Sequence, residues 1–171
     1  MRYGAVDVHY PASGGARAAL VVARDSTFTT LAEEHVAWLP TAEPYLPGSF
    51  FTRELPAIQA VLARTAVPDL LVVDGYVDLD PAGRPGLGMH VHRYTGRVVV
   101  GVAKTAFRTA THAVAVHRGQ STRPLYVTAA GIDVDRAAAF VAAMAGAGRI
   151  PDALRHVDRL ARLNVLRDPG T

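Results

Sequence analysis

The sequence predicts an α/β fold with a mixed five-stranded sheet, three antiparallel strands followed by parallel strands, flanked by helices. Residues 2–39 hold three β-prone segments separated only by short turn sequences, which is typical of antiparallel pairing. Residues 50–163 alternate β-branched runs with amphipathic segments, which indicates a sheet with parallel strands. Half of the 171 residues are apolar and no linker divides them, so we expect one domain over residues 1–171.

The first three strands are expected at residues 2–10, 17–24 and 27–39, with a Gly-rich turn and an Asp-Ser turn between them. Asp7 lies between Val6 and Val8 in the first strand. A charge inside a strand is costly unless that face lines a polar site, so Asp7 is a candidate site residue. Trp38, near the end of the third strand, is interpreted as a core or rim aromatic and not as a binding platform.

A run of four apolar residues at positions 70–73 is bounded by Pro68 and Gly75 and predicts a strand buried on both faces. Such strands occupy the centre of α/β sheets. Asp74 ends this run, and the carboxyl ends of central strands border the crevice where open α/β sheets bind ligands. Asp74 therefore becomes the second candidate site residue.

The remaining elements add three candidates. Helices are expected at 50–66, 86–91, 133–145 and 151–163, and strands at 97–103, around 114–116 and at 124–128. Glu54 lies near the start of the first helix, and Asp158 adjoins the apolar stripe of the last. Lys104 ends a β-branched strand and is the one lysine beside 17 arginines. A compact ammonium in this Arg-rich background indicates a role that a planar guanidinium cannot fill.

Composition excludes several classes of protein. Without cysteine, neither a disulfide framework nor a thiolate metal site can form. No apolar run approaches the roughly 20 residues that span a bilayer, and no leader precedes the first strand, so we expect a cytoplasmic protein without membrane association. Neither G-x-G-x-x-G nor a P-loop is present, which argues against a nucleotide-binding domain or small-molecule hydrolase. The net charge of +3 permits a polyanionic partner.

The predicted strand order, with acids on the first strand, the first helix, after the fourth strand and on the last helix, is the layout of the ribonuclease H-like fold. Five motifs in collinear order resemble endonuclease V, the deoxyinosine 3′-endonuclease family, over nearly the whole chain. They are Asp7, Pro44-Tyr45-Leu46-Pro47-Gly48 with Arg53-Glu54, Val72-Val73-Asp74-Gly75, Gly101-Val102-Ala103-Lys104 and Pro124-Leu125-Tyr126-Val127-Thr128.

The resemblance implies a role for individual residues. The implied metal ligands are the carboxylates of Asp7, Glu54, Asp74 and Asp158, and the implied catalytic residues are Asp7, Glu54, Asp74 and Lys104. Lys104 is expected to contact the scissile phosphate or the attacking water. Tyr45 matches the wedge that enters the duplex beside a flipped base. The positions that match the hypoxanthine pocket are Phe50, Gly75, Gly86, Gly101 and Phe107.

These residues suit phosphodiester hydrolysis, because oxygen ligands without thiolates select a hard cation such as Mg²⁺, with Mn²⁺ as the alternative. The resemblance implies a metal-dependent endonuclease that cuts DNA or RNA 3′ to a deaminated base such as inosine, in nucleic-acid repair or turnover. Nucleic acid is the expected partner, with no obligate protein partner. Tyr76 and Asp80 stand where the family has histidines, which leaves the base specificity open. The alternative is a nucleic-acid-binding module of the same fold that has lost or changed its cleavage specificity.

Overall fold

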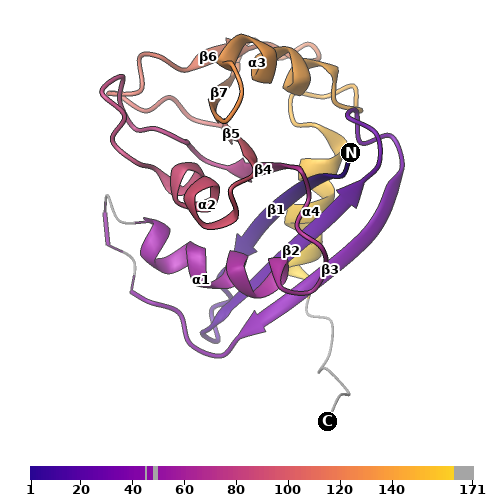
Figure 1. The fold of residues 1–171 in the computed structure, drawn as a ribbon, viewed down its shortest axis with the longest axis vertical. Coiled ribbons are helices and arrows are strands. Elements are labelled where there is room, and N and C mark those ends of the chain that lie inside the picture. Colours follow the sequence, from indigo (N-terminus) through magenta and orange to yellow (C-terminus); the bar gives the residue numbers. More distant parts are fainter. Residues whose placement is uncertain (45, 48–49, 164–171) are drawn as a thin grey trace.

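A computed structural model describes residues 1–44, 46–47 and 50–163 (Figure 1). In this part of the chain a mixed sheet of seven strands has the order β3-β2-β1-β4-β5-β7-β6. The strands are β1 (Tyr3–His9), β2 (Ala16–Ala23), β3 (Leu31–Leu39), β4 (Leu70–Asp74), β5 (Val98–Ala103), β6 (Val114–Val116) and β7 (Leu125–Ala130). The helices are α1 (Phe50–Leu62), α2 (Leu87–Thr95), α3 (Val134–Ala143) and α4 (Asp152–Arg162).

The predicted mixed sheet is confirmed, but its strand count and the direction of its last strands were wrong. Strands β1 to β3 are antiparallel, and β4 and β5 run parallel to β1 as expected. Strand β7 instead pairs antiparallel with β5, and the short β6 adds antiparallel to β7 at the edge. A parallel return needs a crossover, usually a helix, and the segment between β5 and β7 contains β6 but no helix.

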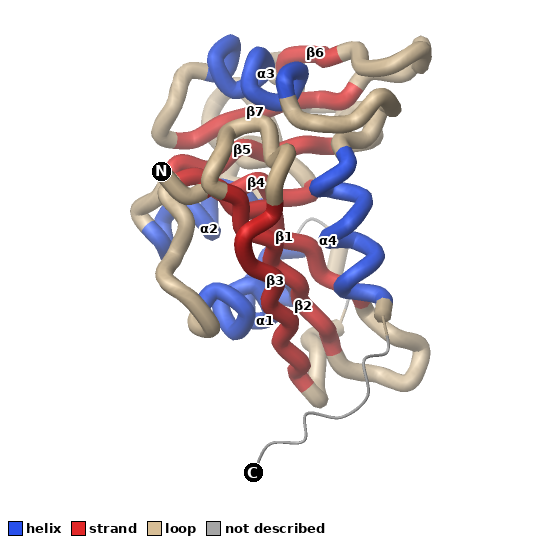
Figure 2. The backbone as a smooth tube through the Cα atoms, turned by 90° about the vertical axis from the view of Figure 1, so that its right-hand side faces the viewer, coloured by secondary structure: helices blue, strands red, loops and turns tan. Residues whose placement is uncertain are grey.

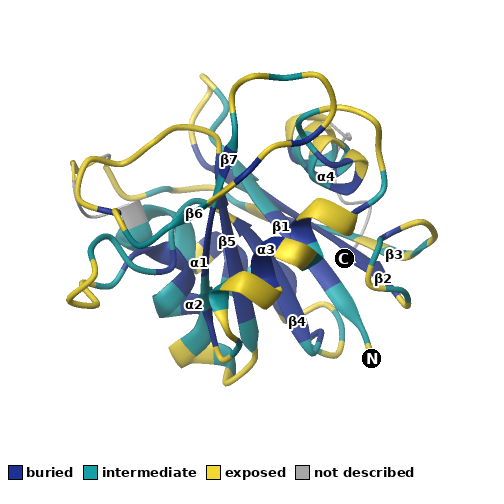
Figure 3. Ribbon diagram, turned by 90° about the horizontal axis from the view of Figure 1, so that it is seen from above, coloured by how far each residue is buried: buried dark blue, intermediate teal, exposed yellow. Residues whose placement is uncertain are grey.

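The helices cover both faces of the sheet and enclose two cores. Figure 2 shows α4 on one side of strands β1 to β3 and α1 on the other. One core packs α3 and α4 against the sheet, and the second packs α1 and α2 against the opposite face. In Figure 3 the strands β4 and β5 are largely buried, while α3 and α4 expose their outer faces. None of the helices described here is long and apolar enough to cross a membrane.

Strand β4 sets the position of the site. Its residues 70–73 are buried on both faces, as the apolar run predicted, and Asp74 at its end is exposed. The parallel register pairs Val6 with Val73 and Asp74 with Val102. The carboxyl ends of β1, β4 and β5 therefore meet at one edge of the sheet, where each strand ends in or next to a candidate residue.

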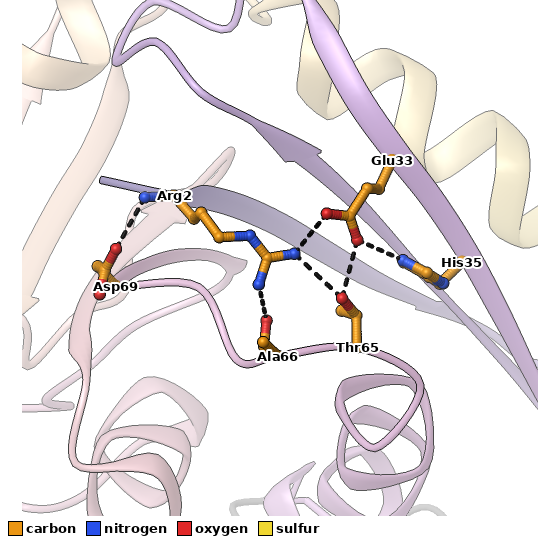
Figure 4. Close-up of polar contacts among 6 residues, drawn as sticks. All are labelled: Arg2, Glu33, His35, Thr65, Ala66 and Asp69. Atoms are coloured by element: carbon orange, nitrogen blue, oxygen red, sulfur yellow. Dashed lines mark hydrogen bonds and ion pairs between the residues drawn. The ribbon is translucent and has the colours of Figure 1, made fainter.

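A polar network lies at the end of the sheet opposite the candidate residues (Figure 4). The Arg2 guanidinium lies 2.6 Å from the Glu33 carboxylate on β3 and 3.0 Å from the Thr65 hydroxyl after α1. Thr65 also donates to Glu33 at 2.8 Å, and His35 lies 2.9 Å from the same carboxylate. The backbone amide of Arg2 donates to Asp69 just before β4. These contacts join β1, β3 and the α1–β4 connection at the end remote from the candidate residues.

Candidate active site

The four candidate carboxylates come from four elements and from both faces of the sheet. Asp7 is on β1, and Asp74 ends the neighbouring strand β4. Glu54 is on α1, on one face, and Asp158 is on α4, on the other. The fold therefore brings acids separated by up to 151 positions in the chain (7 to 158) to the same edge of the sheet.

Burial and mutual repulsion disfavour the charged forms of two of these acids. Burial is the largest cause that raises the pKa of Asp7 to about 7, followed by the charge of Asp74 and the proximity of Asp158. A hydrogen bond from the Val8 amide, at 2.9 Å, acts in the opposite direction. Burial also raises the pKa of Glu54 to about 7, with the charges of Asp74 and Asp7 as the next causes. Asp7, Glu54 and Asp74 thus lie within electrostatic reach of one another.

Two cations border this cluster. The Lys104 ammonium lies 3.3 Å from an Asp74 carboxylate oxygen, and about half of each side chain is exposed. Arg162 donates to Asp158 at 2.9 Å from one turn further along α4. Burial alone would raise the pKa of Asp158, but hydrogen bonds with Arg162 and Asp7 and the charges of Arg162 and Lys104 hold it below its ordinary value. The surroundings of Asp158 therefore favour its ionised form, unlike those of Asp7 and Glu54.

The donor set fits a hard divalent cation, because it consists of carboxylate oxygens whose repulsion a bound cation would relieve. Among the residues that the structure describes, however, no three carboxylate or histidine side chains converge closely enough to hold an ion. Lys104 also lies against Asp74, the acid whose charge acts on both Asp7 and Glu54. Binding a cation therefore requires the carboxylates to turn toward a common point.

A hollow of about 590 Å³ adjoins the cluster and shares Glu54, Asp74 and Lys104 with it. This volume is within the range of about 300–1,000 Å³ that is usual for small-ligand pockets. Its walls are mainly apolar and come from α1, the β4–α2 loop, the start of α2 and the segment after β5. The lining includes four predicted substrate-binding or uncertain residues, Gly75, Tyr76, Gly86 and Phe107, together with Phe51, Leu79, Arg84 and Leu87.

Two glycines are required by close backbone packing. A Cβ at Gly86 would lie 2.5 Å from the Tyr76 carbonyl oxygen. A Cβ at Gly101 would lie 2.6 Å from the Gly75 carbonyl oxygen and 2.7 Å from the Thr128 hydroxyl. Gly86 lines the hollow, whereas Gly101 is buried on β5 beneath the turn that carries Gly75. Gly101 therefore allows the turn with Gly75, which lines the hollow, to pack closely on β5.

Tyr76 and Asp80, which the resemblance places at histidine positions of the family, occupy different places. The Tyr76 hydroxyl donates to the Thr105 carbonyl at 2.7 Å, and its ring centroid lies 5.8 Å from that of Phe107 on the wall of the hollow. Asp80 instead accepts from the Arg84 amide at 3.1 Å and lies 3.7 Å from the Arg84 guanidinium. Tyr76 thus belongs to the hollow, while Asp80 stabilises its own loop.

Two of the predicted substrate-binding side chains cannot be placed. Tyr45, the expected wedge, lies outside the described residues. Phe50 begins α1, but its side chain is likewise outside the described set. Their predicted roles stay predictions.

Tyr10 and Arg53 lie beside the site, although the sequence did not predict a role for either. The Arg53 guanidinium lies 3.7 Å from the centroid of the Tyr10 ring, next to Glu54 in the chain. Burial raises the pKa of Tyr10, and the charge of Glu54 is the next cause, so this pair borders the acid cluster. The motif Arg53-Glu54, one of those that resemble the family, could have indicated that Arg53 lies near the site. Trp38, interpreted as a core or rim aromatic, is 47% exposed.

The family is decided by comparison with known proteins. A sequence model described as Endonuclease V matches residues 2–121. The chain belongs to the endonuclease V family. Endonuclease V of Streptomyces avermitilis is 30% identical over an alignment 182 positions long, which covers 94% of this chain and 79% of that protein. Endonuclease V of Azotobacter vinelandii is 40% identical over 124 residues, covering 71% of this chain but 55% of the relative, so the match spans about half of that protein.

Solved structures of endonuclease V have the same fold. The crystal structure of the Streptomyces avermitilis protein superposes with a TM-score of 0.80 at 29% identity, covering 95% of this chain and 80% of that one. Ciona intestinalis endonuclease V (D234N), in complex with a 23mer DNA containing an inosine followed by a ribo-adenosine, gives a TM-score of 0.79 at 18% identity. That match covers 94% of this chain and 83% of the Ciona chain. The ribonuclease H-like fold implied by the resemblance is confirmed.

Proposed function

We propose that this endonuclease V family member is a divalent-metal-dependent endonuclease that hydrolyses a phosphodiester bond of DNA or RNA 3′ to a deaminated base such as inosine. The observation that carries the proposal is that the acid cluster and the hollow share Glu54, Asp74 and Lys104. A base in the hollow would place its own backbone phosphate next to the carboxylates and the ammonium. The inosine-containing DNA bound by the Ciona protein makes a deaminated base the first ligand to test.

The chain's own residues would divide the chemistry between them. A bound Mg²⁺ or Mn²⁺ would acidify the attacking water and offset charge on the leaving oxygen. Asp7, Glu54, Asp74 and Asp158 would hold the cation. Once a cation binds Asp74, the Lys104 ammonium, now 3.3 Å from that carboxylate, would be released to donate to a phosphate oxygen. Lys104 would thus exchange the Asp74 carboxylate for an oxygen of the substrate phosphate.

The hollow suits a base taken out of the stack. Enzymes that read a single base extrude it into a pocket and hold it by stacking and by hydrogen bonds to its edge. Tyr76 and Phe107 supply aromatic surface on one wall. Gly86 permits close approach of the backbone there. Because Tyr76 replaces a family histidine, we propose that the base edge is read differently here.

The second candidate function is a nucleic-acid-binding module that does not cut. One observation favours it: no three carboxylate or histidine side chains among the described residues form a ready metal cage. Such a module would bind nucleic acid without metal-dependent hydrolysis.

The experiment is cleavage of end-labelled single- and double-stranded DNA and RNA, each with and without one inosine, in Mg²⁺, Mn²⁺ and EDTA. The test variant is Asp74→Asn, and the matched control is Asp135→Asn, which changes an exposed acid on α3. Cuts next to inosine that need metal, disappear in Asp74→Asn and persist in Asp135→Asn would support the proposal. Binding without cutting on any substrate would replace it with the non-cutting module.

A further inference from the structure

Three side chains form a row across the first three strands, beside the acid cluster. The register pairs His9 on β1 with Arg17 on β2, and Arg17 with Trp38 on β3. Directly paired residues project from the same face of a sheet, so these side chains lie side by side. Asp7, two residues before His9, projects from that face as well, because side chains alternate along a strand. The row thus lies on the α4 side of the sheet, at the end where the candidate site is.

Trp38 is an exposed aromatic that the protein holds in place. The Arg17 guanidinium lies over its ring, 5.4 Å from the centroid. Gly15 packs against the ring edge so closely that a Cβ there would lie 2.5 Å from the Trp38 Cη2 atom. Even so, 47% of Trp38 remains exposed. A fixed, half-exposed aromatic offers a stacking surface at little cost in conformational entropy.

Two guanidinium groups, those of Arg17 and Arg162, belong to or border this row. Arg17 reaches α4 and donates to the Ala161 carbonyl at 3.2 Å. His9 lies within electrostatic reach of Arg17 and Arg162. The Arg162 side chain is 59% exposed and donates to Asp158, which together with Asp7 places negative charge beside the row. Aromatic surface combined with guanidinium groups matches the repeating base and phosphate of a nucleic-acid strand.

We propose that His9, Arg17, Trp38 and Arg162 form a strand-binding platform, on which a nucleic-acid strand flanking the cleavage site stacks one base on Trp38. With strands about 4.8 Å apart and a rise of about 3.4 Å per residue, the Cα atoms of Asp7 and Trp38 are about 12 Å apart. That separation is a few nucleotides along a strand. The proposal rests on the proposed function, because the acid cluster defines where the strand is cut.

The test uses the fact that Trp38 is the one tryptophan of the chain. Intrinsic fluorescence of the wild-type protein is titrated with single-stranded inosine-containing DNA in EDTA, which prevents metal-dependent cutting. Base stacking should quench the Trp38 emission saturably. Heparin, a polyanion without bases, is the parallel probe and should leave the emission largely unchanged. Equal quenching by heparin, or no quenching by DNA, would overturn the stacking assignment.

Variants provide the second readout. Anisotropy of labelled DNA should show affinity weakened on the order of 10-fold in Trp38→Ala and largely kept in Trp38→Phe. The matched control is Tyr94→Ala, which removes an equally exposed aromatic (53%) at the far end of α2. DNA trimmed to one nucleotide on each side of the inosine should bind Trp38→Ala and wild-type protein equally. Trp38→Ala behaving like Tyr94→Ala on long DNA would refute the platform.

The two proposals fail differently. Quenching of Trp38 by DNA in a wild-type protein that cuts no substrate would leave the platform standing and remove the proposed activity. Metal-dependent cutting next to inosine without quenching would keep the activity and remove the platform. In steady-state cleavage of long DNA, Trp38→Ala should raise KM with little change in kcat, since the platform touches no reacting atom.

Discussion

Asp74 ends β4 and Lys104 directly follows the adjacent parallel strand β5, and their charged groups lie 3.3 Å apart at the junction of the acid cluster and the hollow. The side chains are 44% and 45% exposed. Exposed pairs of this kind contribute only about 0–1 kcal/mol to folding. The pair therefore contributes little to the stability of the fold, and the importance of Lys104 lies in the phosphate contact that the proposed function assigns to it.

Replacing Lys104 should impair cleavage without unfolding the protein. Lys104→Ala and Lys104→Arg are both expected to lower kcat on the order of 10²- to 10³-fold, because a planar guanidinium cannot take the place of a compact donor aimed at one oxygen. Their thermal unfolding should stay close to wild type. Arg108→Lys, a change at an exposed position four residues later, is the control. Full activity in Lys104→Arg would show that any cation suffices.

Asp7→Asn should stabilise the metal-free protein at high pH. The pKa of Asp7 is raised in the folded state from 3.8 to about 7, so its contribution to stability is present below its unfolded pKa and is lost as pH rises through about 7. Urea unfolding in EDTA should show Asp7→Asn more stable than wild type by on the order of 1–3 kcal/mol at pH 8. The two proteins should be nearly equal at pH 4. A variant less stable than wild type at pH 8 would contradict the assigned repulsion.

Metal affinity should rise with pH across neutrality. Asp7 and Glu54 both have pKa values raised to about 7, so protons compete with the cation there. A single group with such a pKa is about one tenth ionised at pH 6 and nine tenths at pH 8, which predicts an affinity gain of roughly tenfold or more. Mn²⁺ titration by calorimetry at both pH values measures it. Glu54→Gln should flatten the dependence, and an unchanged profile would exclude Glu54 as a ligand.

Local pattern was sufficient for the elements whose burial is set by their own residues. The apolar run 70–73 predicted a strand buried on both faces, and β4 is that strand. Pairing direction is different, because it depends on the connection between strands and not on residue type, which is why β7 was assigned wrongly. The helix predicted at 86–91 continues as α2 to Thr95 and ends at Gly96, whose φ of 67° is left-handed.

The candidate site was predictable as a set of residues but not as a geometry. Each acid drew attention through its place in one element, whereas the proximity of Asp7 to Asp74 comes from the β1–β4 register. The ion pair of Lys104 with Asp74 and the exposure of Trp38 depend on neighbouring strands. Contacts between strands that are distant in sequence cannot be predicted from local periodicity. The roles of these residues remain predictions.

Substitution of Gly101 distinguishes a packing role below the hollow from direct contact with the base. The resemblance predicts that Gly101 contacts the base. In the structure it is instead buried below the turn that carries Gly75, and a Cβ added at Gly101 would lie 2.6 Å from the Gly75 carbonyl oxygen. Gly101→Ala should therefore destabilise the protein by about 1–3 kcal/mol through overpacking and weaken binding of inosine DNA only through displacement of Gly75. Gly148→Ala is the matched control, because its Cβ would have 4.0 Å of clearance. Differential scanning calorimetry measures the stability of both variants, and titration with inosine DNA measures their binding. Normal stability of Gly101→Ala together with lost inosine binding would show that Gly101 contacts the base, because only direct contact removes binding without destabilising the fold.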